Sequence, residues 1–401
     1  MTDITHSGER ITLGGDPFSR EILSDPFPFD TLVRETAPLV HLEEHGVWAT
    51  GRHAEAEAVF RDWDTFSSAY GTGITNIRRH EHWREPSVIL EVDPPDHART
   101  RAVMQRVLSP ATVARLRDRF RAEAETMVGA LLEHREFDAA KDLAEAFLLK
   151  VLPDAVGMAE EGRHHLLPYA NLNFQAMGPR NELYAEAVEH AGRAPEYVAW
   201  QMRREALAPE GIGAEIYAAA DAEKITDHEA AMLVRSFLSA GIDTTIFGLG
   251  FALHALAVHP EQWDLLRKDP ALARSAFEET LRWKAPSPII GRTTRTPTEF
   301  AGIRLGAQEK VLLFLGAANR DPRRWENPDA FDITRRTAGH LAFGVGIHGC
   351  VGQMMARLEA ESVLGAVARL VRRIELTGAP RIKYSNWLRG FTELPVRVEA
   401  S

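Results

Sequence analysis

The sequence of 401 residues contains a single cysteine, and no unbroken run of about 18 apolar residues that could span a membrane. One cysteine excludes an internal disulfide and is typical of a protein kept in a reducing compartment. Residues 1–19 are polar and lack the apolar centre of a signal peptide. The net charge of −10 argues against general nucleic-acid binding. We therefore expect a bacterial-type cytoplasmic protein with no membrane anchor and no nucleic-acid partner.

Linkers, repeats and low-complexity segments are also missing, so residues 1–401 are expected to form one domain. Helical periodicity dominates the chain. Its longest stretch, residues 226–259, starts with a capping box of Thr226 and Glu229 and is expected to cross the interior as one unbroken helix. The predicted fold class is mainly α with a small β region. Short strands are expected at residues 39–42 and 47–50 and in two further segments, residues 288–317 and 375–399.

The cysteine stands in a loop of unusual composition, residues 340–352, with four glycines and two histidines. Glycines at this density indicate sharp turns or a close approach to a flat group. A helix is expected from residue 351 to 372, and its N-terminal N–H groups would favour a thiolate at Cys350. Three roles are open to this sulfur: a buried apolar side chain, a nucleophile with His348 as base, or a metal ligand. Zinc lacks further ligands at the usual spacing, whereas haem iron needs one thiolate only.

The order of residues in this loop resembles the cysteine motif of the cytochrome P450 superfamily, Phe-Gly-x-Gly-x-His-x-Cys-x-Gly. The resemblance implies the cytochrome P450 fold, with haem b between the long central helix and the cysteine loop. It also implies that Cys350 is the axial thiolate ligand of the iron and that Phe343 and His348 contact the haem. All six fixed positions of the motif are matched, by Phe343, Gly344, Gly346, His348, Cys350 and Gly352.

An acid and an alcohol stand side by side within the long predicted helix, at Asp243 and Thr244. The turns around Asp243 are apolar on every side, so its carboxyl group has no expected solvent face. The segment Ala240-Gly-Ile-Asp-Thr244 resembles the oxygen-activation motif of the same superfamily. The resemblance implies that Thr244 hydrogen-bonds dioxygen at the haem, and that Asp243 relays the protons that cleavage of the O–O bond consumes.

Two more sets of residues resemble positions of the family. Glu279 and Arg282, three residues apart on a predicted helix, match a Glu-x-x-Arg pair that Arg335 would complete, with a structural role. Haem propionates need cationic or N–H partners. One candidate, His97, lies at the start of a helix that Asp96 is expected to cap. The full set of candidate propionate partners is His97, Arg101, Arg292 and His348.

Much of the chain, including residues 83–90, resembles one branch of the superfamily, the bacterial monooxygenases of para-substituted benzoates such as 4-methoxybenzoate. That resemblance implies a carboxylate anchor made by Arg84, Ser87, Arg235 and Ser236. A solvent-facing Arg235 is the alternative. Met177 and Ile290 stand where phenylalanines are expected, which indicates a roomier pocket than in the branch. The expected lining residues are Leu90, Phe174, Met177, Ala240 and Ile290, with Phe391 as a further candidate.

The sequence therefore predicts a haem-thiolate monooxygenase that hydroxylates or O-demethylates a small aromatic carboxylic acid. Its expected partners are dioxygen, an iron–sulfur ferredoxin and an NAD(P)H-dependent ferredoxin reductase. Arg99, Arg106 and Arg357 would face an acidic ferredoxin. Two alternatives remain at this point: a P450 monooxygenase of a neutral hydrophobe, such as a terpene or a methoxyphenol, and a non-catalytic haem-binding sensor. A peroxide-using P450 would lack the acid–alcohol pair.

Overall fold

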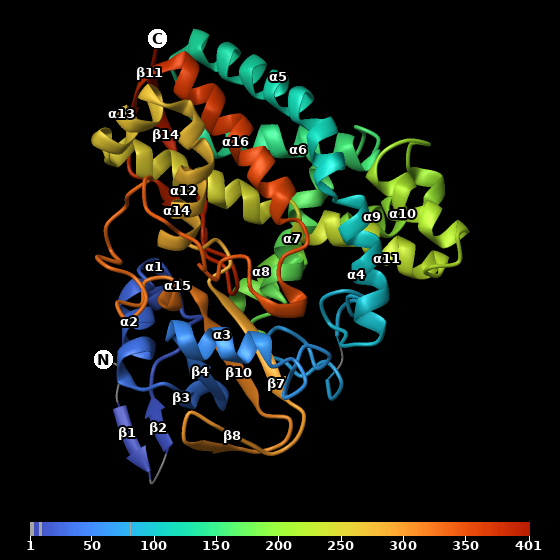
Figure 1. The fold of residues 1–401 in the computed structure, drawn as a ribbon, viewed down its shortest axis with the longest axis vertical. Helices are drawn as coiled ribbons and strands as arrows, with labels where there is room; N and C mark the ends of the chain where they lie inside the picture. Colours follow the sequence, from blue (N-terminus) through green and yellow to red (C-terminus); the bar gives the residue numbers. More distant parts are fainter. Residues whose placement is uncertain (1–3, 8–9, 81) are drawn as a thin grey trace.

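The large sheet lies at the lower end of the protein with α2, α3 and α15, while most helices and the strands β11 and β14 lie at the upper end (Figure 1). The computed structural model describes residues 4–7, 10–80 and 82–401. About 52% of the residues are helical and the sheets are small, which confirms the predicted fold class. The helices are α1 (Arg20–Ser24), α2 (Phe27–Thr36), α3 (His53–Arg61), α4 (Asp96–Val107), α5 (Pro110–His134), α6 (Ala146–Val156), α7 (Leu166–Gln175), α8 (Glu182–Ala191), α9 (Ala194–Gln201), α10 (Ile212–Asp221), α11 (Asp227–Ala240), α12 (Asp243–Val258), α13 (Pro260–Lys268), α14 (Ala273–Trp283), α15 (Leu315–Ala318) and α16 (Gln353–Leu370), with a π-helical turn η2 (Ala139–Glu145).

The largest sheet has the strand order β1-β2-β3-β4-β10-β7-β5, so strands from both ends of the chain lie side by side. Its centre pairs β10 with β4 in parallel and with β7 in antiparallel orientation. A three-stranded sheet, β11-β14-β6, and two hairpins, β8-β9 and β12-β13, complete the β structure. The strands are β1 (Ile4–Ser7), β2 (Arg10–Leu13), β3 (Val40–Leu42), β4 (Val47–Thr50), β5 (Phe66–Ser67), β6 (Glu136–Asp138), β7 (Ile289–Thr294), β8 (Thr298–Phe300), β9 (Ile303–Leu305), β10 (Lys310–Phe314), β11 (Val371–Leu376), β12 (Arg381–Ile382), β13 (Phe391–Glu393) and β14 (Pro395–Ala400).

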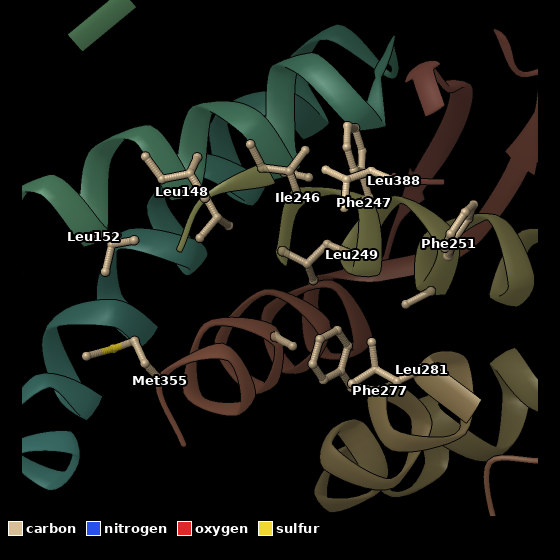
Figure 2. Packing of buried hydrophobic residues seen from close by; sticks show 14 of the residues in the cluster. Leu148, Leu152, Ile246, Phe247, Leu249, Phe251, Phe277, Leu281, Met355 and Leu388 are labelled. Atoms are coloured by element: carbon tan, nitrogen blue, oxygen red, sulfur yellow. The ribbon is translucent and has the colours of Figure 1, made fainter. Parts of the chain in front are cut away.

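Helix α12 lies in the centre of the hydrophobic core, because it is apolar on nearly every side. Figure 2 shows Ile246 and Leu249 of α12 among side chains of α6, α14 and α16. Gly248 lets α14 approach closely, since a Cβ atom there would lie 3.0 Å from the ring of Phe277. The α11–α12 pair is long and apolar enough to cross a membrane, but 72% of its apolar window is buried inside the protein. A helix that is buried to this extent is typical of the core of a globular protein.

The predicted unbroken helix over residues 226–259 is wrong at one place, because α11 ends at Ala240 and α12 begins at Asp243. The hydroxyl group of Thr244 donates a hydrogen bond of 3.2 Å to the carbonyl of Ala240. A side-chain hydroxyl that donates to a carbonyl of the preceding turn, next to a glycine, weakens the backbone hydrogen bonds of the helix and bends it. The break therefore falls on the acid–alcohol motif itself.

The start of the long helix is confirmed. Glu229 N–H donates to the Thr226 hydroxyl at 3.1 Å, and Thr226 N–H donates to the Glu229 carboxylate at 2.8 Å. The expected cap at Asp96 is wrong, since Asp96 is the first residue of α4 and Pro95 precedes it without a side-chain hydrogen bond. An acid in the first turn still interacts favourably with the helix dipole.

Candidate cofactor and substrate site

The cysteine loop packs on the C-terminal end of α3, and two of its glycines are required by geometry. Gly344 and Gly346 have φ angles of +63° and +73°, which residues with a Cβ atom rarely adopt. A Cβ atom at Gly346 would also lie 2.7 Å from the carbonyl oxygen of Phe60. The N–H of Cys350 donates to the carbonyl of Phe343 at 2.7 Å. This hydrogen bond closes the segment 343–350 and holds Phe343 next to Cys350.

Desolvation raises the pKa of the Cys350 thiol, although the N–H groups of Gly352 and Gln353 and the charges of Arg101 and Arg357 lower it in part. The N–H groups beside the sulfur favour a thiolate, as expected, but they do not offset the desolvation of the sulfur. Helix α16 begins only at Gln353, and its N–H groups do not outweigh the loss of water around the sulfur. A coordinated metal cation deprotonates a thiol outright, so the sulfur is suited to an iron ligand more than to a free nucleophile.

Four buried or partly buried side chains could donate hydrogen bonds to an anionic group: His97, Arg101, Arg292 and His348. His97 is 3% exposed and its ring centroid is 4.3 Å from that of His348. Within the described part of the chain, His97 Nε2 and both ring nitrogens of His348 have no hydrogen-bond partner. Burial lowers the pKa of Arg292 to about 10 and also lowers that of Arg101. Unpartnered donors and buried cations of this kind fit the propionates of a haem.

The imidazoles are held in their neutral form. Burial lowers the pKa of His97 to about 4, and His348 and Arg101 lower it further. Burial also lowers the pKa of His348, although Asp93 lies 3.8 Å from its Nε2 atom and opposes the shift. Neutral imidazoles can donate one N–H each to a carboxylate without the cost of a buried charge.

The break between α11 and α12 is the second candidate part of the site. Ala240 is exposed and Thr244 is half-buried, although the helix pair crosses the interior. Asp243 is 4% exposed and its Oδ1 atom has no hydrogen-bond partner among the described residues. Burial raises the pKa of Asp243 to about 7, while Lys383 lowers it and Glu145 raises it. An acid with a pKa near neutrality can both take up and release a proton at neutral pH.

The pKa of Asp243 predicts a pH-dependent stability. Because burial raises this pKa from 3.8 to about 7, the native state binds more protons than the unfolded chain between these values. Stability is therefore lost as the pH rises through this range. Asp243→Asn removes this titration, so the variant should gain about 2–3 kcal/mol on the wild type between pH 5 and pH 7. Urea unfolding followed by circular dichroism measures the gain.

The matched control for this prediction is Asp264→Asn, which changes an exposed aspartate on α13. Its stability should follow that of the wild type at every pH. Parallel pH profiles for Asp243→Asn and the wild type would show that Asp243 stays ionised in the native state and would contradict the prediction.

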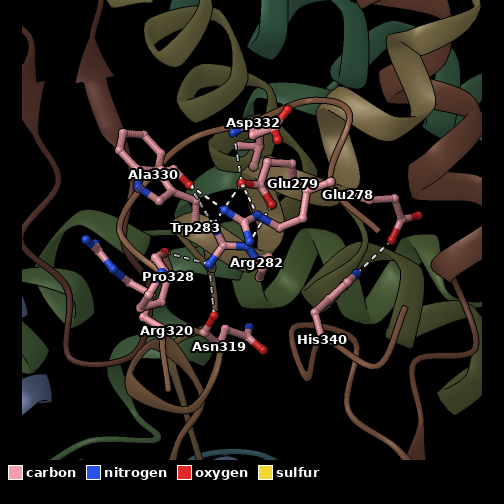
Figure 3. Close-up of polar contacts among 12 residues, drawn as sticks. Glu278, Glu279, Arg282, Trp283, Asn319, Arg320, Pro328, Ala330, Asp332 and His340 are labelled. Atoms are coloured by element: carbon pink, nitrogen blue, oxygen red, sulfur yellow. Dashed lines mark hydrogen bonds and ion pairs between the residues drawn. The ribbon is translucent and has the colours of Figure 1, made fainter. Parts of the chain in front are cut away.

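Glu279 and Arg282 form a fully buried ion pair of 2.6 Å that fixes the segment before the cysteine loop (Figure 3). All five N–H groups of Arg282 are used, because it also donates to the carbonyls of Asn319, Pro328 and Ala330. Arg335 Nε lies 3.2 Å from the Glu279 carboxylate, so the structure brings the three residues of the expected set together. We infer a structural role for this set, since it ties α14 to residues 319–335.

Sequence reasoning missed two acids that hold the same region. Glu278 binds His340 at 2.7 Å and also contacts Arg357 of α16, so it joins α14 to both sides of the cysteine loop (Figure 3). Burial would raise the pKa of Asp93, but the nearby imidazole of His348, 3.8 Å away, and the hydrogen bond from the Ser67 hydroxyl lower it to about 2. The sequence offered one signal for these two acids, which is that each stands close to a residue already singled out. Glu278 precedes Glu279, and Asp93 stands four residues before His97.

The expected carboxylate anchor is assembled in part. Arg235 is 7% exposed, which excludes the solvent-facing alternative, and it donates to the carbonyl of Glu85 at 2.8 Å. Arg84 donates to the same carbonyl at 2.9 Å, so the two guanidinium groups lie side by side. Arg84 also forms an ion pair of 2.9 Å with Glu91 and a hydrogen bond with Asn173. Arg84 is therefore paired with a carboxylate of the protein itself, whereas Arg235 has no carboxylate partner among the described residues.

The two serines of the expected anchor already have internal partners. The Ser87 hydroxyl accepts the N–H of Leu90 at 3.1 Å, and the Ser236 hydroxyl donates to the carbonyl of Met232 at 3.1 Å. Each hydroxyl oxygen keeps a lone pair or a proton for a further contact.

The expected lining residues fall into different clusters. Phe174 and Met177 pack with the main hydrophobic core, whereas Ile290 packs with a smaller cluster over the large sheet. Phe391 contacts Phe251 and His254, about two helical turns beyond Thr244.

Two of the three arginines expected on the ferredoxin face are already paired. Arg99 binds Glu229 at 2.5 Å and Arg357 binds Glu278. Arg106 is exposed and, within the described residues, has no ion-pair partner.

The loop sulfur, the unpartnered imidazole donors and the buried acid at the helix break together fit a haem-thiolate oxidoreductase. The Cytochrome P450 family model matches residues 200–377. Cytochrome P450 CYP199A2 of Rhodopseudomonas palustris is 50% identical over 387 residues, which are 96% of this chain and 94% of the relative. Cytochrome P450-terp of a Pseudomonas species is 29% identical over 397 residues, 92% of this chain and 93% of the relative. This chain belongs to the cytochrome P450 family and is a monooxygenase with a haem held by a cysteine thiolate.

Solved structures agree with this assignment. Cytochrome P450 CREJ, in complex with (4-ethylphenyl) dihydrogen phosphate, superposes with a TM-score of 0.87 and 28% identity, over 96% of this chain and 99% of that one. Cytochrome P450 CYP109Q5 of Chondromyces apiculatus superposes with a TM-score of 0.81 and 30% identity, over 97% and 99% of the two chains.

Proposed function

We propose that the protein is a cytoplasmic P450, one domain over residues 1–401, that hydroxylates or O-demethylates small para-substituted aromatic carboxylic acids. Electrons would come singly from an iron–sulfur ferredoxin and its NAD(P)H-dependent reductase. The observation that carries the proposed substrate class is the pair of buried arginines, Arg84 and Arg235, which share one carbonyl. The 50% identity with CYP199A2 across the chain supports the likeness to one branch of the family.

Two adjacent guanidinium groups are costly in a buried site. Burial lowers the pKa of Arg235, and the neighbouring charge of Arg84 lowers it further. Within the described residues, Arg235 donates one hydrogen bond to the protein and pairs with no carboxylate, although a guanidinium carries five N–H groups. A buried guanidinium without a counter-charge favours a carboxylate ligand, because two of its parallel N–H donors match the two oxygens of the carboxylate.

The spacing between the anchor and the reactive side suits one aromatic ring. Ser236 on α11 and Thr244 on α12 are eight residues apart across the break, and a continuous helix of that length would rise about 12 Å. A benzoate with a small para substituent fills roughly that distance. The ligand bound to CREJ, (4-ethylphenyl) dihydrogen phosphate, is also a para-substituted phenyl ring that carries an acidic group. This likeness supports an aromatic anion as the type of ligand.

When bound, haem with a thiolate ligand supplies the activation of dioxygen. Thr244 would place its hydroxyl group next to the reacting oxygen, and Asp243 would pass protons to it from the inside of the helix break. For O-demethylation the aryl methyl ether, dioxygen, two electrons and two protons give the phenol, formaldehyde and water. Both protons must cross the buried region around Asp243, whose pKa of about 7 suits repeated proton transfer.

The proposal is tested by titrating the haem spin state with 4-methoxybenzoate and with its uncharged amide. The acid should bind far more tightly than the amide, because only the acid neutralises Arg235. Arg235→Met should weaken acid binding by about 30-fold or more and leave amide binding unchanged. The exposed Arg115→Met serves as the control and should behave as the wild type. Equal affinities for the acid and the amide in the wild type would indicate a neutral substrate, such as a terpene or a methoxyphenol.

A further inference from the structure

Glu91 is a buried carboxylate at the centre of the proposed anchor. It is 7% exposed, and its Oε2 atom accepts hydrogen bonds from Arg84 at 2.9 Å and from the N–H of Ser87 at 2.8 Å. Burial alone would raise its pKa, but Arg84 and the Ser87 N–H lower it below the usual value. Glu91 is therefore ionised at neutral pH, and it neutralises one of the two arginines.

The charges around the anchor then leave one positive charge in excess. Arg84 and Arg235 contribute two, and Glu91 removes one. The side chain of Glu85 is half exposed and its carboxylate points away to His228, at 2.7 Å. Across the described segments of the chain, no other carboxylate contacts either guanidinium group.

The remaining titratable neighbours carry little charge above neutral pH. Burial and the charge of Arg84 lower the pKa of His82, and burial raises the pKa of Tyr169. Lys310, on β10, interacts with Glu91 at longer range and donates to the carbonyl of Gly71. Burial lowers its pKa to about 7, so at pH 8 it is mainly uncharged. Arg180 is the exception and stays charged, but it is exposed to water, which screens its charge, and it stacks on the ring of Tyr184.

We infer that Glu91 sets the charge of the ligand that the anchor accepts, and that it selects monoanionic aryl carboxylates against dianionic aryl phosphates. The inference rests on the proposed function and extends it to a specificity-determining residue. A monoanion matches the single excess charge. A dianion adds a second negative charge close to the Glu91 carboxylate, and nothing in the described surroundings compensates it.

Glu91 also positions the anchor. Its contacts with Arg84 and Ser87 close the segment over residues 84–91, in which both of these anchor residues lie. Glutamine at this position keeps the shape and an oxygen acceptor for the Ser87 N–H but removes the charge. Glu91→Gln therefore separates the effect of charge from the effect of geometry.

The experiment compares three ligands with haem-loaded protein at pH 8: 4-methoxybenzoate, 4-methoxybenzamide and 4-methoxyphenyl phosphate, which is a dianion above a pKa of about 6. The wild type should prefer the benzoate to the phosphate. Glu91→Gln should shift this ratio toward the phosphate by about tenfold or more, because two uncompensated arginines then face the ligand. The amide serves as the reference in both proteins, because its binding reports any general loss of affinity.

A second variant keeps the inference testable even where Glu91→Gln lowers affinity in general. Arg84→Gln combined with Glu91→Gln restores a single excess charge, so the preference for the benzoate should return. An unchanged benzoate-to-phosphate ratio in Glu91→Gln, in protein with full haem content, would overturn the inference and leave the proposed function intact. Equal binding of benzoate and amide by the wild type would instead overturn the proposed function.

Discussion

Cys350→Ser is expected to abolish turnover while haem still binds. The serine hydroxyl is far less electron-donating than a thiolate, so the push that favours cleavage of the O–O bond is lost, and turnover should fall by about a thousandfold or more. The propionate partners His97, Arg101, Arg292 and His348 remain, and they should retain the cofactor. Product formation per haem and the spectrum of the reduced, carbon-monoxide-bound protein measure the two effects.

The wild type should give the thiolate type of spectrum and Cys350→Ser should not. A wild-type protein without the thiolate signature would contradict ligation by Cys350. Turnover close to that of the wild type in Cys350→Ser would contradict the role of the thiolate. Ser239→Ala, a small change on α11 next to the helix break, serves as the control and should retain the wild-type spectrum.

Glu279→Gln is expected to destabilise the protein by about 3–5 kcal/mol, because it leaves Arg282 buried without its counter-charge. The cost is large since the Glu279 carboxylate accepts hydrogen bonds from Arg282, from Arg335 and from the N–H of Asp332. Urea unfolding of the haem-bound variant should show the loss, together with faster release of haem, since residues 319–335 precede the cysteine loop.

Glu299→Gln is the matched control, because Glu299 is exposed on β8. Its stability should stay within about 0.5 kcal/mol of the wild type. A similarly small change in Glu279→Gln would show that the buried pair carries little of the stability of this region.

Local sequence signals predicted the parts of the site that depend on near neighbours. The capping box of Thr226 and Glu229 needs three residues of separation, and Gly344 and Gly346 permit the positive φ angles that the loop adopts. The burial of Asp243 also followed from the sequence, because apolar residues fill every face of the turns beside it.

Contacts between distant segments could not be predicted in the same way. Glu278 reaches His340 across 62 residues and Arg357 across 79. The break between α11 and α12 depends on the hydroxyl of Thr244 competing with a backbone group, which helical periodicity does not reveal. Glu91 looked like an ordinary acid in a loop, and only the fold shows that its carboxylate meets Arg84.

The most direct test of the account is turnover of 4-methoxybenzoate by the protein with a ferredoxin, its reductase and NAD(P)H. The account predicts 4-hydroxybenzoate and formaldehyde in equal amounts, with far slower turnover of 4-methoxybenzamide. Equal rates for the acid and the amide, or consumption of NAD(P)H without either product, would contradict it.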